Sequence, residues 1–231
     1  MSPTVSSARL IRLALPLVKT HGFTRGALAR SVLELPPSEA HSEPLSDTAV
    51  SVLFGNGDLS RRTLIQAWLQ DGLRHMASVR RPTTNTDVAD PNSRVKQATV
   101  GDILRARLEY NEPVLPYLPE AFALLASPSS GLPPLDPTQA IRHAFNVADE
   151  ACYITGAKSL QLDWYARRVS LAAAYAASEL HQFTSPQTAY SFLDSLLMTS
   201  SNLKSSLDEV DLYSSYIFKS WKGIFKSSGI L

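Results

Sequence analysis

The most concentrated group of charged and aromatic side chains in the sequence is one run of six residues, Asp163-Trp164-Tyr165-Ala166-Arg167-Arg168. On a helix, the i,i+4 spacing lets Asp163 form an ion pair with Arg167. The same spacing lets Trp164 stack on the guanidinium of Arg168. Trp164 and Tyr165 would point to adjacent sides of the helix, so we expect at most one of these rings to be fully buried. A tryptophan beside charged groups is typical of a protein-interaction anchor, and the alternative is that it fills a core.

Side chains that bind metals or act as nucleophiles are scattered along the sequence. The histidines form neither a His-x-x-x-His nor a Glu-x-x-His pair, so we expect no metal site and no di-iron bundle. Cys152 lies in an apolar helical pattern, which favours a buried structural cysteine over a nucleophile. Glycine-rich nucleotide motifs are missing as well. We therefore expect no catalytic residue and no cofactor, and the alternative is an enzyme that uses a tyrosine or an arginine as its acid–base group.

The last segment, roughly Asp208 to Ser228, has the periodicity of an amphipathic helix. At about 100° per residue its aromatic and aliphatic side chains share one broad side and its lysines the other, which is typical of a helix lying in a membrane interface. The alternative is a helix docked on the protein core. The residues expected to bind the membrane are Tyr216, Ile217, Trp221, Lys222, Ile224, Phe225 and Lys226.

The segments that carry these groups are all predicted to be helical. No segment alternates with period two over the length of a strand, so the predicted fold class is all-α. Thr24 and the pair Ser46-Asp47 are each expected to cap the start of a helix, and Asp136 is expected to cap another, with Pro137 at its first position. The predicted helices are Ser7–Thr20, Thr24–Leu33, a short one after Ser46-Asp47, Ser60–Val79, Gly101–Tyr110, Tyr117–Leu125, one from Asp136 to about Thr155, Leu162–Phe183 and one after Ser185-Pro186.

Composition narrows the class of protein. The 231 residues are 44% hydrophobic and carry a net charge of +1, so they can build a core and have no general attraction for nucleic acid. A single cysteine suits a reducing compartment, and no apolar stretch approaches the roughly 20 residues of a membrane-spanning helix. Five basic residues precede the first acidic residue, Glu34, as in a mitochondrial transit peptide. We interpret this start instead as the first folded helix, in which case a presequence would precede it.

The first three predicted helices, with the turn Gly22-Phe23-Thr24 between the first two, resemble a helix-turn-helix module followed by a helical ligand-binding domain. TetR-type transcriptional regulators have this organisation, and their third helix reads the DNA major groove through basic or amide side chains. The candidate third helix, Ser46–Phe54, contains no Lys, Arg, Asn or Gln. We therefore expect no nucleic-acid partner and keep a TetR-type DNA-binding regulator as the alternative.

The sequence from Leu162 to Arg168, together with the residues that follow it, resembles that of a known family. Its continuation, Leu171-Ala172-Ala173-Ala174-Tyr175 with Ser178-Glu179-Leu180, resembles the hallmark of the ubiquinone (coenzyme Q) biosynthesis accessory family, the ninth Coq protein. The resemblance covers nearly the whole chain and is densest from about Arg105 to Leu197. Further matching residues are Phe23, Arg107-Leu108, Pro116-Tyr117, Pro119-Glu120-Ala121-Phe122, Leu125, Ser185-Pro186, Thr188 and Tyr190-Ser191-Phe192-Leu193.

The resemblance implies a non-enzymatic homodimer with a TetR-like fold that has lost DNA binding. It also implies a pocket for isoprenoid lipids and a peripheral place on the matrix side of the mitochondrial inner membrane. The implied partner is the demethoxyubiquinone hydroxylase, to which the protein would present a quinone intermediate. Trp164, Tyr165 and Arg168 would face this partner, and the last helix would bind the membrane.

The implied division of the chain has four parts. Residues 7–79 would form the helix-turn-helix-like part, 80–99 a polar loop, 100–206 the lipid-binding part and 207–231 the membrane-associating helix. An apolar pocket holds a polyprenyl tail by burying its surface, at about 25 cal/mol per Å². Periodicity alone suggests as lining residues Leu104, Leu108, Leu118, Phe122, Leu125, Phe145, Leu171 and Tyr175.

Overall fold

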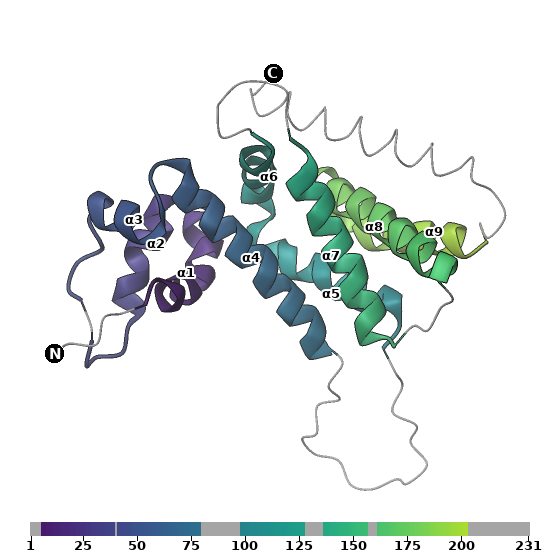
Figure 1. Cartoon of the computed structure of the whole chain (residues 1–231), viewed down its shortest axis with the longest axis horizontal. Coiled ribbons are helices and arrows are strands. Elements are labelled where there is room, and N and C mark those ends of the chain that lie inside the picture. Colours follow the sequence, from purple (N-terminus) through teal and green to yellow (C-terminus); the bar gives the residue numbers. More distant parts are fainter. Residues whose placement is uncertain (1–5, 40, 80–97, 128–135, 157–160, 203–231) are drawn as a thin grey trace, which may run out of the picture. The chain divides into compact units, whose positions relative to one another are not determined.

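The computed structural model describes residues 6–39, 41–79, 98–127, 136–156 and 161–202. All regular elements in these ranges are helical, which confirms the all-α prediction (Figure 1). They are α1 (Ser7–His21), α2 (Arg25–Arg30), the 3-10 helix η1 (Ser31–Glu34), α3 (Asp47–Phe54), α4 (Asp58–Val79), α5 (Val100–Asn111), η2 (Glu112–Tyr117), α6 (Leu118–Ala126), α7 (Thr138–Ile154), α8 (Gln161–Thr184), η3 (Pro186–Thr188) and α9 (Ala189–Asn202).

Side-chain caps begin three of these helices where the sequence provides them. Thr24 accepts a hydrogen bond from the backbone N–H of Ala27, and Ser46 accepts one from Ala49, each at 3.2 Å. A full capping box opens α5: the Asp102 N–H donates to the Thr99 hydroxyl oxygen at 3.1 Å, and the Thr99 N–H donates back to the Asp102 carboxylate at 2.9 Å. The predicted caps at Thr24 and Ser46 are therefore confirmed.

Helix α7 begins one residue later than predicted. Its first helical residue is Thr138, and Pro137, which was expected at the first position, precedes it with helical backbone angles. The backbone N–H of Asp136 donates to the carbonyl of Ala126 at 2.9 Å, so Asp136 belongs to the connection that closes α6. Helix α4 begins earlier than predicted, at Asp58, and its third residue, Ser60, is buried and donates to the carbonyl of Gly57 at 2.8 Å.

The described chain forms two compact units. The first comprises Met1–Asp71 and Pro113–Asp136 and therefore contains α1–α3, the first part of α4, η2 and α6. Its core includes the edge-to-face pair Phe23–Trp68, with ring centroids 6.0 Å apart. Gly22 ends α1 with φ of 64°, and a Cβ there would lie 2.9 Å from the ring of Tyr117. The turn after α1 consequently requires glycine for both its backbone angle and its packing.

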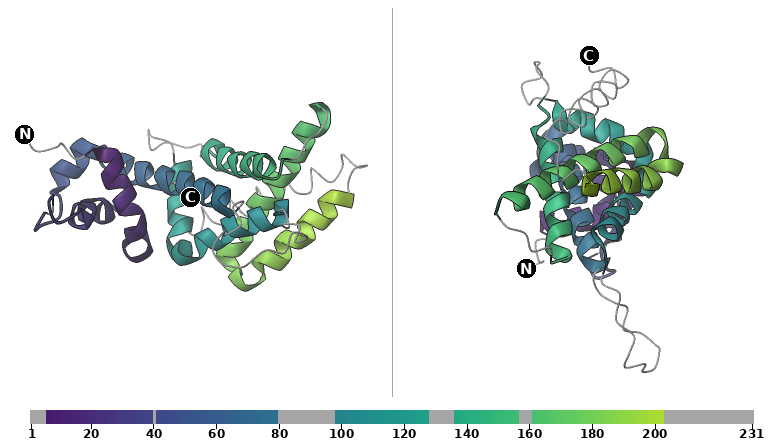
Figure 2. Two further views of the ribbon diagram at one scale, coloured as in Figure 1. Left: turned by 90° about the horizontal axis from the view of Figure 1, so that it is seen from below. Right: turned by 90° about the vertical axis from the view of Figure 1, so that its right-hand side faces the viewer.

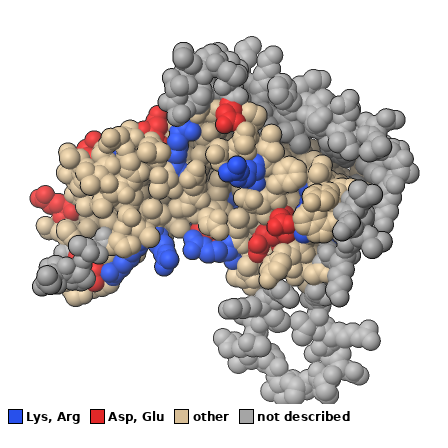
Figure 3. Space-filling model, viewed as in Figure 1, with Lys and Arg blue, Asp and Glu red and all other residues tan. Residues whose placement is uncertain are grey.

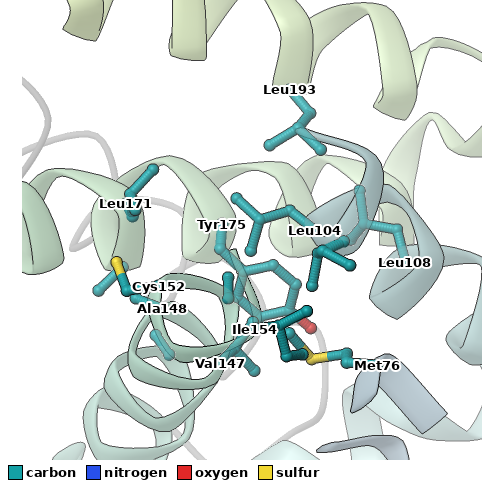
Figure 4. Packing of buried hydrophobic residues seen from close by; sticks show 14 residues of the cluster. Met76, Leu104, Leu108, Val147, Ala148, Cys152, Ile154, Leu171, Tyr175 and Leu193 are labelled. Carbon is teal, nitrogen blue, oxygen red and sulfur yellow. The ribbon is translucent and has the colours of Figure 1, made fainter. Parts of the chain in front are cut away.

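The second unit comprises Gly72–Glu112 and Pro137–Leu231, and its described part contains the end of α4 with α5, α7, α8 and α9. Helix α8 packs against α7 and α9, and α5 packs against α7 and α9 (Figure 2). Figure 4 shows Tyr175 pointing from α8 into the middle of the apolar cluster. That cluster also contains Met76, Ile103, Leu104, Leu108, Ala144, Val147, Ala148, Ala151, Cys152, Ile154, Leu171, Ala172 and Leu193.

The boundaries of these compact units differ from the boundaries of the four parts expected from the sequence. In particular, residues 113–136 group with the N-terminal part. The expected loop 80–99, except its last two residues, and the expected membrane helix 207–231 lie outside the described residues. No helix in the described ranges combines the length and the hydropathy that crossing a membrane requires.

Candidate functional site

The first turns of α8 carry the predicted aromatic–cation contact. The guanidinium carbon of Arg168 lies 3.6 Å from the ring centroid of Trp164, which confirms the stacking expected from i,i+4 spacing. The Nε of Arg168 also donates to the Asp149 carboxylate on α7 at 2.6 Å. Asp149 therefore holds the cation from a neighbouring helix, which the local sequence pattern did not reveal. The predicted pair of Asp163 with Arg167 stays a prediction, because the Asp163 side chain lies outside the described residues.

Trp164 and Tyr165 form a surface feature. Their rings meet edge to face with centroids 4.6 Å apart, Trp164 is half-buried, and Tyr165 is 66% exposed. Neither ring is fully buried, in agreement with the sequence expectation. The Arg168 side chain is 14% exposed, so the ring of Trp164 rests on a cation that is itself held in place. Such a rigid, half-exposed aromatic group suits contact with another protein.

Helix α7 adds more aromatic surface beside this contact. Phe145, Asp149 and Tyr153 follow one another at four-residue spacing and are all exposed, so they share the outer face of α7. The Asp149–Arg168 ion pair joins this face to Trp164 on α8. We call Phe145, Tyr153, Trp164 and Tyr165 around this ion pair the aromatic surface. The four-residue spacing on α7 is the sequence signal that could have identified it.

The suggested lining residues fall into three places. Four of them share the apolar cluster of the second unit, and three are buried in the first unit. Phe145 is 40% exposed and lies on the aromatic surface. The four in the second unit are Leu104, Leu108, Leu171 and Tyr175, and the three in the first are Leu118, Phe122 and Leu125. The structure thus brings together four of the eight.

A buried polar network crosses the second unit beside this cluster. One oxygen of the Glu179 carboxylate accepts hydrogen bonds from the Tyr175 hydroxyl at 2.6 Å and from the Asn111 amide at 2.9 Å. The His143 ring nitrogen lies 3.4 Å from the same oxygen. Asn111 in turn accepts a hydrogen bond from Nη1 of Arg107. Residues of α5, α7 and α8 are therefore tied together through one carboxylate.

The network keeps Glu179 ionised in spite of its burial. Desolvation alone would raise the pKa of this carboxyl, but the charge and hydrogen bond of His143, the charge of Arg107 and the hydrogen bond of Tyr175 outweigh it. The resulting pKa is about 2, below the ordinary value of 4.5. Burial raises the pKa of the Tyr175 hydroxyl well above its ordinary value, so that hydroxyl stays a hydrogen-bond donor.

Sequence reasoning missed this network, although one signal was present. Arg107 lies among apolar residues on the inner face of α5 and is fully buried. A charged residue on the apolar face of a helix indicates a buried partner. Cys152, by contrast, was correctly expected to be buried, and its burial raises the pKa of the thiol.

Arg25, which is bonded to α3, the helix at the position that reads DNA in TetR-type regulators, is engaged within the first unit. Arg25 donates to the carboxylate and the backbone carbonyl of Asp47 and to the hydroxyls of Ser51 and Ser60. Helix α3 itself contributes no cation. On the face shown in Figure 3, the blue areas are small and separated by uncharged residues. Among the described residues there is also no group of three His, Cys, Asp or Glu that could hold a metal ion.

Comparison with known proteins gives one consistent set of relatives. Residues 138–204, which contain the aromatic surface and α7–α9, match the COQ9 family model. The chain is 29% identical over 211 residues, or 88% of its length, to the mitochondrial ubiquinone biosynthesis protein COQ9 of Drosophila melanogaster. It is 26% identical over 63% of its length to the protein of that name from Schizosaccharomyces pombe, and 24% over 87% to that from Bos taurus. It spans 55–59% of the length of these relatives.

Proposed function

We propose, on the premise that the chain is related to the COQ9 family of ubiquinone biosynthesis proteins, that it serves ubiquinone biosynthesis as a lipid-binding accessory protein. It binds an isoprenoid quinone intermediate and presents it to the demethoxyubiquinone hydroxylase without performing the chemistry itself. It acts as a homodimer at the matrix face of the mitochondrial inner membrane. The mitochondrial part of this proposal follows the names of the relatives.

The aromatic surface is the observation that carries the proposal. It lies within the segment that matches the family model, and it exposes large rings that a folded protein ordinarily buries. Trp164 is held by Arg168, and Arg168 is held by Asp149, so the surface is ordered before a partner arrives. A preorganised aromatic anchor loses little conformational entropy on binding, which favours a specific protein partner.

Lipid binding rests on the apolar cluster of the second unit. Leu104, Leu108, Leu171 and Tyr175 were suggested as lining residues from sequence and lie together in this cluster. A tail packed among such side chains is removed from water, which supplies the binding free energy. Membrane association is proposed for residues 207–231 from their amphipathic sequence, since anionic lipids attract a lysine-bearing helix.

Two measurements on the full chain test the proposal. Native mass spectrometry should find a bound isoprenoid or phospholipid, and a lipid-free protein would argue against a carrier. A pull-down should retain the demethoxyubiquinone hydroxylase with the wild type and lose it with Trp164→Ala. Met198→Ala is the matched control, because Met198 is 70% exposed on α9 and lies outside the aromatic surface. Equal retention by both variants would remove the aromatic surface from partner binding.

Membrane association has its own test. The full chain should float with liposomes that contain cardiolipin, and a chain ending at Ser206 should stay behind while keeping its lipid. Flotation of the shortened chain would assign membrane binding to another part of the protein.

A further inference from the structure

Arg107 has two buried donors that the rest of the described protein does not use. Its Nη1 donates to Asn111, but Nε and Nη2 are buried without a hydrogen-bond partner among the described residues. An arginine side chain stays charged in a protein, so burying these N–H groups is costly unless an acceptor meets them. Buried donors without a partner are rare in folded proteins, and an acceptor on a bound molecule would account for these two.

Gly72 determines which side of the guanidinium is covered. A Cβ built on Gly72 would lie 2.8 Å from both Cζ and Nε of Arg107 and 3.1 Å from Nη2. A group in the guanidinium plane that faced Nε and Nη2 would lie farther from Cζ than from either nitrogen. The Cβ position of Gly72 is as close to Cζ as to Nε, so Gly72 lies over the flat face of the guanidinium. The Nε–Nη2 edge, where a forked acceptor binds, therefore points elsewhere.

The charges of the network favour an uncharged acceptor. Glu179 is ionised, and it is linked to Arg107 through Asn111, so one negative charge already accompanies the buried cation. An anionic ligand would meet the negative charge of Glu179 nearby and would have to give up its hydration to reach this buried site, which costs much more than removing a carbonyl oxygen from water. A carbonyl oxygen satisfies the two N–H donors without adding charge.

The apolar cluster lies directly beside the network. Tyr175 belongs to both, because its ring packs in the cluster and its hydroxyl donates to Glu179. On α5, Leu104 lies three residues before Arg107 and Leu108 one residue after it, and both belong to the cluster. A molecule with an apolar body and one carbonyl oxygen matches both surroundings at once.

We propose that the Nε–Nη2 edge of Arg107 binds the ring carbonyl of a quinone whose apolar part packs against the cluster around Leu104 and Leu108. This inference rests on the proposed quinone binding and names the group that holds the head of the ligand. Gly72 serves as a positioning residue, since it lets the guanidinium lie flat against α4.

The test compares two probes on the full-length protein: decylubiquinone and decylbenzene, which has the same tail length and no carbonyl. Arg107→Lys keeps the positive charge and removes the forked edge, so it should weaken the binding of decylubiquinone about ten- to hundredfold. Decylbenzene binding should stay unchanged. Arg105→Lys is the matched control, because Arg105 lies on the same helix but is partly exposed and pairs with Asp194.

The outcomes separate this inference from the proposed function. If Arg107→Lys binds both probes as the wild type does, the head is held elsewhere and quinone binding itself still stands. If the wild type binds neither probe, the proposed function fails first. The infrared carbonyl band of decylubiquinone on the wild type provides a readout that needs no variant. Hydrogen bonding to Arg107 lowers its frequency relative to hexane solution, and an unshifted band overturns the inference and leaves an ordered water as the acceptor at this edge.

Discussion

Tyr175 and Glu179, one turn apart on α8, are joined inside the second unit by a hydrogen bond of 2.6 Å from the phenol to the carboxylate. Both side chains are buried, so this bond forms without competition from water. The same carboxylate oxygen accepts from Asn111, which places α5 in a fixed register against α8. A single oxygen thus links the apolar cluster to the buried charges.

Removing the phenolic hydroxyl should destabilise the protein. Tyr175→Phe leaves the buried carboxylate with one donor fewer, which should lower the free energy of unfolding by about 1–3 kcal/mol. Urea denaturation followed by circular dichroism measures it. Tyr165→Phe is the control, since Tyr165 is exposed and should change stability by less than about 0.5 kcal/mol. Equal effects of the two substitutions would contradict the role of this hydrogen bond.

The free energy of unfolding should depend on pH through the ionisation of Glu179. The pKa of this carboxyl in the folded protein is about 2 against an ordinary 4.5. A depressed pKa contributes stability above the unfolded value, and this contribution is lost as the pH falls from about 4.5 towards 2. The free-energy difference between the wild type and Glu179→Gln should therefore shrink in this window. Urea titrations from pH 6 to pH 3 test it, and a constant difference would rule out the linkage.

Two glycine substitutions should have opposite effects. Gly72→Ala places a methyl group 2.8 Å from the buried guanidinium of Arg107, and the resulting overpacking should cost about 1–3 kcal/mol. Gly101→Ala meets Leu197 at an ordinary 3.5 Å, and alanine is the better helix former by up to about 1 kcal/mol. Melting temperatures of the two variants should move in opposite directions, and a stable Gly72→Ala protein would refute the close approach.

Asp149 should affect partner binding more than stability. Its carboxylate is 62% exposed, so Asp149→Asn should cost less than about 1 kcal/mol of folding free energy. The substitution weakens the hold on Arg168, on which the ring of Trp164 rests. A double-mutant cycle with Trp164→Ala, measured on hydroxylase binding, should show coupling between the two residues. Additive effects would show that Asp149 does not act through Trp164.

Arg25 should be essential for the order of α3. Its guanidinium joins Asp47 and Ser51 of α3 to the start of α4 at Ser60. Arg25→Met removes these donors and should lower the free energy of unfolding by about 1–3 kcal/mol, measured by urea denaturation. Arg12→Met is the control on the exposed face of α1. Comparable stability of the two variants would show that the Arg25 contacts contribute little.

The sequence predicted what depends on local spacing. The caps at Thr24 and Ser46 and the stacking of Arg168 on Trp164 involve residues three or four positions apart, and the structure confirms them. The contact of Asp149 with Arg168 depends on how α7 packs against α8, which no local pattern encodes. The start of α7 was expected one residue too early, and the bond of the Asp136 backbone N–H to Ala126 at the end of α6 is likewise a contact that no local pattern encodes.

The buried network was harder to predict for the same reason. Arg107, His143 and Glu179 come from three helices, and none of them indicates in the sequence which residues of the other two helices it meets. Their meeting is a consequence of tertiary packing. The pattern around Arg107 indicated a buried face of α5 but not the partner that faces it.

The discontinuous first unit has a consequence for synthesis of the chain. Residues 1–71 leave the ribosome before residues 113–136, which carry buried side chains of the same unit, including Leu118 and Phe122. Tyr117, whose ring packs on Gly22, arrives about a hundred residues after it. The nascent first helices consequently expose an apolar surface until the second segment emerges, and this interval is where a chaperone would act on the growing chain.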